Sequence, residues 1–303
     1  MALSPKSNSK NCATPSPNSC KRAQQPPNQR VRPQSLLLGL RDLGKPYWLL
    51  IANAGLLIGL ACGCSRVAAP SQVVDWRSLR PGLSYAAVSI GIDNGDHRAS
   101  AHVVRFDPSR YELQVVLAAE TGASLAQASA FRQAAHGLVA FNGGYFDHQW
   151  RPLGLLVSRG AELSPLRKVD HGVFALARHA ALVRHARQWL APPDLEFALE
   201  CGPRLLIGGQ APHFRSADRA RRTALALDDR GRVVVAVTEG VVSLAEFANW
   251  LSKPATAGGV GATEALNLDG GPSSMLEVAV DATFAQVLAP TPVPVGVAIV
   301  ERK

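Results

Sequence analysis

Cysteine is scarce in most of this chain. Four of the five cysteines, Cys12, Cys20, Cys62 and Cys64, fall within the first 64 residues, and only Cys201 lies beyond them. One cysteine cannot form an internal disulfide, which excludes a small extracellular domain stapled by disulfides. The chain also has no Cys-x-x-Cys pair and no His-Glu-x-x-His motif, so two common metal signatures are missing. Cys201 is more typical of a small buried apolar residue than of a nucleophile.

Most of the chain also lacks an excess of either charge. Residues 1–66 hold nine lysines and arginines and one acidic residue, whereas residues 67–303 hold 23 bases and 22 acids. The net charge of +9 therefore belongs almost entirely to the leader. A nucleic-acid partner is not expected, because the part with a globular composition carries no basic excess. A nucleic-acid-binding function would be expected only if the leader itself bound nucleic acid.

The leader reads as two segments. Residues 1–44 are basic and rich in Pro, Ser, Asn and Gln, a composition that predicts disorder. An apolar run of 15 residues follows at 47–61, which is short for a membrane span and typical of a signal-peptide core. It ends in Ala-Cys-Gly-Cys, so residues 45–66 resemble a bacterial lipoprotein signal with Cys64 as the lipidated residue. We therefore expect an exported protein, periplasmic or membrane-anchored; an uncleaved N-terminal anchor is the competing reading.

Residues 67–303 are expected to form a single α+β domain with a mixed, largely antiparallel sheet covered by a few helices. Short apolar runs separated by turn residues predict the strands. These strands are 86–92, 101–106, 111–117, 138–141, 153–157, 173–177, 181–183, 223–227, 232–238, 265–268 and 295–300. A helix is predicted at 124–135 with Ser124 as its N-cap, and another from 244 to about 251 behind the capping box Ser243–Glu246.

Two of these strands run into Gly-Gly turns: Asn-Gly-Gly at 142–144 and Asn-Leu-Asp-Gly-Gly at 267–271. A strand that ends this way delivers a polar side chain to the rim of the sheet, and glycine lets a ligand approach the backbone closely. Asn267 and Asp269 are two residues apart, so an extended backbone points them to the same face. Either turn alone could be an ordinary loop, but two in one chain favour a functional site.

Five segments share a recognisable order: FNGGYFD at 141–147, PLGL at 152–155, ECGPRL at 200–205, RTA at 222–224 and ALNLDGGPSS at 265–274. Together they resemble the phosphodiester glycosidase family over a region from about residue 83 to the C-terminus. Ala226 departs from the glycine usual in the family, and residues 177–197 carry no family signature. The resemblance implies hydrolysis of a sugar–phosphate diester at the anomeric C–O bond.

That reaction needs a cation for the phosphate and a carboxylate that activates water or stabilises an oxocarbenium-like transition state. Arg222 is the expected cation and Asp269 the expected carboxylate, with Glu239 as its catalytic partner. Glu200 and Arg204 are second candidates for these roles. Including them, the expected substrate-binding residues are Asn142, Gly143, Gly144, Asp147, Glu200, Arg204, Asn267, Gly270, Gly271, Ser273 and Ser274.

A second function class remains open. The same cleft could bind a glycan without cleaving it, in an envelope protein of polysaccharide assembly or export; the enzyme is favoured because pure binding would not need this combination of charges. The expected substrates are sugar phosphates or glycans of the cell envelope or exopolysaccharide. No cofactor is expected, although oxygen ligands from Asp269, Asn267 and Asp147 could suit Ca²⁺.

Overall fold

The computed structural model describes residues 73–303. The predicted leader and the apolar segment with Cys64 lie outside the described residues. Within residues 73–303, no helix combines the length and apolarity needed to cross a membrane.

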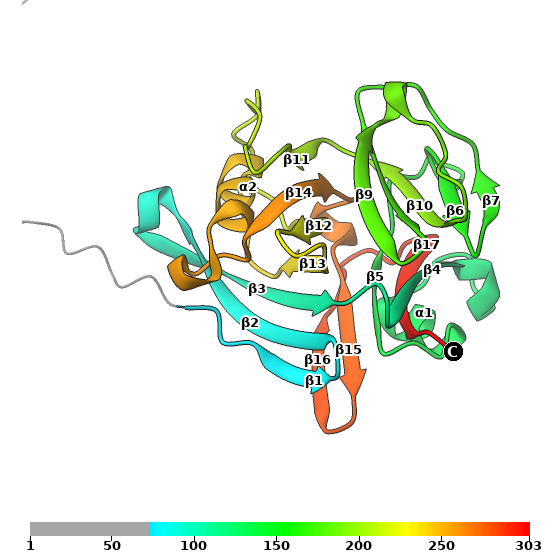
Figure 1. The fold of residues 1–303 in the computed structure, drawn as a ribbon, viewed down its shortest axis with the longest axis horizontal. Helices are drawn as coiled ribbons and strands as arrows, with labels where there is room; N and C mark the ends of the chain where they lie inside the picture. Colours follow the sequence, from blue (N-terminus) through cyan, green and yellow to red (C-terminus); the bar gives the residue numbers. More distant parts are fainter. Residues whose placement is uncertain (1–72) are drawn as a thin grey trace, which may run out of the picture. The chain divides into compact units, whose positions relative to one another are not determined.

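The largest sheet has seven strands in the order β1-β2-β3-β13-β12-β14-β11 (Figure 1). Its strands are β1 (Arg77–Arg80), β2 (Leu83–Ile92), β3 (His97–Phe106), β13 (Val233–Thr238), β12 (Thr223–Asp228), β14 (Ala262–Asn267) and β11 (Arg204–Leu206). All six residues of β13 are buried. The reason is its central position: α2 (Leu244–Ser252) packs on one face of the sheet and residues of the other two sheets pack on the other.

Two five-stranded sheets complete the β structure. The second sheet consists of β7 (Ala161–Ser164), β6 (Leu156–Ser158), β10 (Leu195–Cys201), β8 (Gly172–Ala177) and β9 (Ala180–His185), in that order. The third consists of β16 (Thr283–Val287), β15 (Leu276–Val280), β5 (Val139–Asn142), β17 (Val295–Glu301) and β4 (Tyr111–Leu117). One apolar core draws buried side chains from all three sheets.

The C-terminal strand β17 lies inside the third sheet, between β5 and β4 (Figure 1). Gly296 of β17 is paired with Asn142 of β5. A Cβ atom on Gly296 would lie 2.2 Å from the Phe131 ring, so only glycine lets α1 (Ala128–Ala134) pack this closely on the sheet.

Helical structure is sparse in the described part. Besides α1 and α2 it comprises the 3₁₀ turns η1 (Asp93–Gly95), η2 (Ala118–Thr121), η3 (Ala186–Gln188), η4 (Ala255–Ala257) and η5 (Gly271–Ser273). All neighbouring strands pair antiparallel. The expectation of a mixed sheet was therefore wrong in that detail, and strands dominate the α+β domain more than predicted.

The first helix also begins later than predicted. Gln127, not Ser124, is the N-cap of α1, and its side chain makes no capping bond. Instead, Gln127 bonds both the carbonyl and the amide of Ala289, and Ala126 forms a β-bridge with Val293. These tertiary contacts hold the preceding residues extended and override the local helix signal. The predicted Ser243–Glu246 capping box is present at the start of α2.

Candidate active site

The two Gly-Gly turns touch each other through Asn142. The Asn142 side chain has no exposed surface. Its Nδ2 donates to the Asp269 carbonyl at 2.8 Å, and its Oδ1 accepts from the Thr223 hydroxyl at 2.8 Å and the Met275 amide at 3.2 Å. Asn142 therefore ties β5 to β12 and to the second turn. The structure shows its amide engaged within the protein, where the sequence predicted contact with a sugar.

The glycines of the two turns meet different surroundings. A Cβ on Gly143 would lie 2.8 Å from Val295 Cγ1, and one on Gly144 would lie 3.1 Å from the Glu200 carbonyl oxygen. Both let neighbouring strands approach. Gly271 has a φ of +58° and open space where a Cβ would be. Of these three glycines, Gly271 is the one that leaves room for a ligand; substrate contact at this glycine stays a prediction.

Asp269 is half-buried at the second turn. Its Oδ1 accepts the Gly270 amide at 2.9 Å. Burial raises the pKa of the Asp269 carboxyl above its ordinary value, against hydrogen bonds from the Ser273 side chain and the Gly270 backbone that lower it. A carboxyl group with a raised pKa near other polar side chains is a common feature of catalytic sites.

Tyr145 is the site residue that sequence reasoning missed, although it lies within the first family-like segment. Its hydroxyl donates to the Gly202 carbonyl at 2.5 Å, and Asn267 Nδ2 donates to the same oxygen at 3.0 Å. Burial raises the pKa of Tyr145 strongly; the charge of Asp269 adds to the shift, and the hydrogen bond with Asn267 and the charge of Arg222 oppose it. Tyr145 is thus a neutral phenol close to Asp269 and Arg222, two of the three predicted catalytic residues.

Cys201 adjoins this cluster without being reactive. Its side chain is fully buried, and desolvation raises the pKa of the thiol to about 12. A thiol that stays protonated is a poor nucleophile, in agreement with the apolar role predicted for it.

Arg222 lies close to the second Gly-Gly turn. A Cβ on Gly270 would lie 3.9 Å from Arg222 Cδ. Arg222 Nε donates to the Val242 carbonyl at 3.2 Å and Nη2 to the Asp218 carbonyl at 2.8 Å. Burial lowers the pKa of the Arg222 guanidinium. These bonds fix the guanidinium and leave donors for an anion. In contrast, the neighbouring Arg221 bonds the carbonyls of Leu288 and Ser274, in addition to Thr238.

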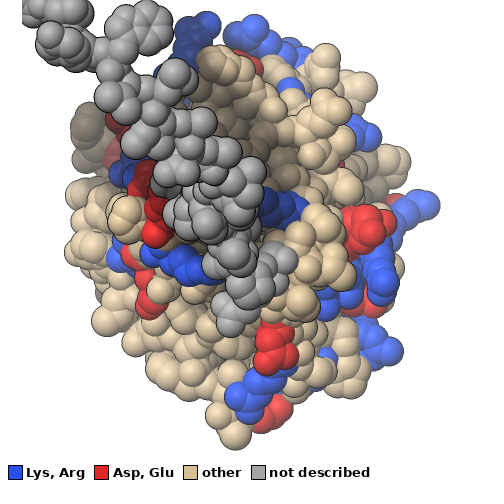
Figure 2. Space-filling view, turned by 90° about the vertical axis from the view of Figure 1, so that its left-hand side faces the viewer, with Lys and Arg blue, Asp and Glu red and all other residues tan. Residues whose placement is uncertain are grey.

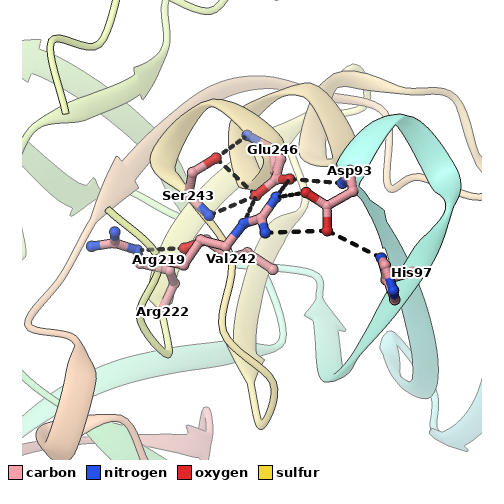
Figure 3. A network of polar contacts seen from close by, with 7 residues as sticks. All are labelled: Asp93, His97, Arg219, Arg222, Val242, Ser243 and Glu246. Atoms are coloured by element: carbon pink, nitrogen blue, oxygen red, sulfur yellow. Dashed lines mark hydrogen bonds and ion pairs between the residues drawn. The ribbon is translucent and has the colours of Figure 1, made fainter. Parts of the chain in front are cut away.

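A charged cluster of Arg219, Glu246, Asp93 and His97 lies next to the Arg222 anchor points (Figure 3). Arg219 donates to Glu246 Oε2 at 3.1 Å and Oε1 at 2.6 Å, and to both carboxylate oxygens of Asp93. Glu246 also accepts the amide of Ser243, the residue after Val242. Figure 3 shows the Arg222 guanidinium pointing away from this cluster. The cluster therefore holds the two backbone segments to which Arg222 is bonded.

Glu246→Gln should destabilise the protein at neutral pH by on the order of 1–2 kcal/mol, because it removes charge-assisted hydrogen bonds at a helix cap. Hydrogen bonds from Arg219 lower the pKa of Glu246 to about 2. Its stabilisation is therefore present above an ordinary glutamate pKa near 4.3 and is lost as the pH falls toward 2. Thermal unfolding from pH 7 to 2 tests this. Equal melting temperatures at pH 7, or a gap that widens in acid, would contradict the expectation.

Glu239 and Asp147 have other partners. Glu239 is exposed, lies 3.5 Å from His102 Nε2, and lines a cavity of about 340 Å³ beside β2 and β3. Its charge also raises the pKa of Tyr85, after the larger effect of burial. The Asp147 carboxylate accepts two backbone amides of its own turn and pairs with Arg151 at 2.7 Å. Asp147 thus stabilises its turn, and a catalytic role for Glu239 stays a prediction.

Orphaned polar atoms gather around this region. Within residues 73–303, five buried side-chain nitrogen or oxygen atoms have no hydrogen-bond partner. Four of them belong to segments that the sequence singled out or to their neighbour His171: Asn267 Oδ1, Ser274 Oγ, Glu200 Oε1 and His171 Nδ1. Glu200 Oε1 and His171 Nδ1 face each other at 3.7 Å. Because unpaired buried groups are costly in a folded protein, Asn267 Oδ1 and Ser274 Oγ, both in the segment that holds Asp269, favour a functional role for that segment.

Two further predictions concern ions and charge. Among residues 73–303, no three His, Cys, Asp or Glu side chains are grouped so as to hold a metal ion; the calcium site therefore stays a prediction. Figure 2 shows acidic and basic side chains interspersed over one face of the molecule, in keeping with the balanced charge of this region.

Comparison with solved structures gives the same fold. The chain superimposes on the catalytic domain of zebrafish N-acetylglucosamine-1-phosphodiester alpha-N-acetylglucosaminidase, auto-inhibited by its pro-peptide. The TM-score is 0.56 at 19% identity, over 76% of this chain and 87% of that one. The chain also superimposes on a hypothetical protein from Synechocystis with a TM-score of 0.50 at 16% identity, over 76% of this chain and 64% of that one.

Sequence comparison identifies the family. No curated protein matches the chain. The family model for phosphodiester glycosidase matches residues 136–300, a range that holds Asp269, Arg222, Tyr145 and both Gly-Gly turns. This match covers more than half of the sequence. The chain belongs to the phosphodiester glycosidase family.

Proposed function

We propose that this protein hydrolyses a glycosyl-1-phosphodiester at the anomeric C–O bond. The observation that carries the proposal is the arrangement of Asp269, Arg222 and Tyr145. Asp269 precedes Gly270, where a Cβ would lie 3.9 Å from Arg222 Cδ, and Tyr145 shares the Gly202 carbonyl with Asn267, two residues before Asp269. Arg222 suits a phosphate, since it offers a rigid set of donors. Asp269 suits the activation of water or the stabilisation of positive charge at the anomeric carbon.

Departure of the phosphate makes the reaction feasible with few groups. The leaving group is a phosphomonoester, whose second pKa is about 6, so the broken C–O bond leaves a well-stabilised anion. Tyr145 and Asn267 both donate to the Gly202 carbonyl, and we assign contact with the sugar to the segments that they hold together. The proposed substrates are cell-envelope or exopolysaccharide-type glycans, and the proposed location is the bacterial envelope, by export and lipidation at Cys64.

Hydrolysis in ¹⁸O-labelled water tests the proposal directly. The first probe is N-acetylglucosamine linked through phosphate to a simple alcohol, followed by other glycosyl phosphodiesters. Cleavage at the anomeric carbon places ¹⁸O on the sugar, whereas a phosphodiesterase would place it on phosphate. Asp269→Asn is the inactive control. Glycan binding without turnover over the whole panel would favour the non-catalytic glycan-binding function instead.

A further inference from the structure

Glu200 is a buried carboxylate that the proposed reaction does not use directly. Its side chain is wholly buried on β10. Oε2 accepts the backbone amides of Leu155 and Arg167, both at 2.9 Å. These two bonds fix the plane and direction of the carboxylate. The other oxygen, Oε1, has no hydrogen-bond partner, and it is directed toward His171.

His171 lies 3.7 Å from that oxygen through its Nδ1, which is also buried and unpartnered. A lone pair on Nδ1 would face the carboxylate lone pairs and be repelled. A proton on Nδ1 instead gives an attractive N–H···O contact that shortens easily to a hydrogen bond. Neutral His171 should therefore carry its proton on Nδ1. Glu200 fixes both the tautomer and the orientation of the ring.

The rest of the ring lies beside the candidate site. The His171 side chain is 30% exposed although Nδ1 is buried, so the exposed surface belongs to other atoms of the side chain. A Cβ on Gly202 would lie 2.9 Å from His171 Cδ2, the atom bonded to Nε2. The Tyr145 and His171 ring centroids lie 5.8 Å apart. The Cδ2 side of the ring therefore packs against Gly202, whose carbonyl receives Tyr145 and Asn267.

We propose that His171 is a further catalytic residue, the general acid that protonates the departing phosphate oxygen, and that Glu200 is its positioning residue. This inference rests on the proposed function. With Nδ1 facing Glu200 at 3.7 Å, it is Nε2 of protonated His171 that gives its proton. Glu200 thus orients the ring, the role that a third group plays beside other catalytic histidines. Asp269 and His171 then approach the anomeric centre from different segments.

The step conserves atoms and charge. The C1–O bond to phosphate breaks, and its electron pair stays on the phosphate oxygen, which receives the proton from His171 Nε2. The water oxygen forms the new bond to C1 and loses a proton to Asp269. The products are the free sugar and a phosphomonoester. Afterwards, neutral His171 regains a proton from solvent and Asp269 releases one.

Other charged groups lie around His171. The Arg204 stem passes next to the following residue, since a Cβ on Gly172 would lie 2.7 Å from Arg204 Cγ. Asp170 precedes His171 but pairs with His185 at 3.0 Å. The hydrogen bond with His185 is the main cause of the lowered pKa of Asp170, and the charge of Arg204 lowers this pKa only slightly. The groups that face the ring itself are Glu200 and the Tyr145 phenol.

The kinetic test measures kcat and KM of the full-length chain on an alkyl glycosyl phosphodiester. His171→Gln should lower kcat about 100-fold or more with little change in KM. Glu200→Gln should lower kcat by a smaller factor, again with little change in KM, because the amide no longer orients the ring for proton transfer. His185→Gln, which removes a histidine paired with a surface aspartate, is the matched control and should behave as the wild type. A kcat near the wild-type value in His171→Gln would overturn the proposal.

A second measurement does not depend on turnover. Nitrogen-15 NMR of histidine-labelled protein reports the tautomer of each ring. We expect Nδ1–H for neutral His171 in the wild type and Nε2–H in Glu200→Gln, whose amide would donate to Nδ1. An Nε2–H tautomer in the wild type would refute the pairing. Wild-type inactivity on every diester, with the expected tautomers present, would contradict the acid role and the proposed function while leaving the Glu200–His171 pairing established.

Discussion

Asp269→Asn should lower kcat by about 10³-fold or more while the protein remains folded. Asparagine keeps an oxygen that can accept the Gly270 amide, the bond that Asp269 Oδ1 makes at 2.9 Å. It removes the negative charge that would take a proton from water or stabilise an oxocarbenium-like centre. The measurement is single-turnover kinetics beside thermal unfolding.

Because the pKa of Asp269 is raised in the folded protein, its contribution to stability depends on pH. Burial favours the neutral carboxyl in the folded state. Its stabilising contribution is therefore complete below the ordinary aspartate pKa near 3.9 and is lost as the pH rises through the higher folded-state value. At pH 7 the charged form of Asp269 opposes folding. The free energy of unfolding of Asp269→Asn should therefore be at most about 1 kcal/mol lower than that of the wild type. The acid limb of wild-type activity should also lie above the ordinary aspartate range.

The matched control is Asp281→Asn. Asp281 has an exposed side chain that pairs with Arg80 at 3.1 Å, and its φ of 50° suits asparagine. We expect wild-type turnover from this variant, since surface ion pairs contribute little. Near-normal activity of Asp269→Asn would remove Asp269 from the mechanism.

Asn142→Ala should destabilise the protein by about 3 kcal/mol, a fall in melting temperature of roughly 6–12 °C. The substitution leaves the Thr223 hydroxyl, the Met275 amide and the Asp269 carbonyl without their partner inside the protein. Each of these groups is costly when buried and unpaired. The site should loosen as well, because the second turn loses its tie to β5.

Asn249→Ala serves as the control for Asn142→Ala. Asn249 is exposed on α2, where alanine is the better helix former, so the melting temperature should stay the same or rise slightly. Suppose instead that Asn142→Ala melts like the wild type and only raises KM. The amide would then contact the sugar, as the sequence predicted, and its role as a tie between sheets would be refuted.

The local patterns of the sequence identified the strongest elements. β4, the β12–β13 hairpin and the capping box of α2 follow from alternation, turn residues and a four-residue motif. β10, β15 and β16 were missed. β15 is completed by β5, whose residues lie more than 130 positions earlier, and β16 pairs with β15 alone, so the hairpin that they form depends on a neighbour distant in the chain. The start of α1 was misplaced for the same reason.

The site divides in a similar way. A polar residue beside a glycine pair pointed to Asp269, because such turns are visible in a short window, and the family-like segment RTA at 222–224 pointed to Arg222. The place of Asn142 could not be read from sequence, as its partners Thr223 and Met275 are 81 and 133 residues away. The Glu200–His171 pairing is equally invisible, since it joins β10 to the residue just before β8.

The position of β17 also constrains when the protein can become active during its synthesis. Translation delivers the chain from the N-terminus, and domains fold once their contacts are complete. β5, which ends in Asn142, is bordered by β15 on one side and by β17 on the other, so both of its neighbours are synthesised long after it. The two turns can lock together only after β17 has emerged. A nascent or truncated chain that lacks β17 (Val295–Glu301) should therefore be inactive and sensitive to proteases.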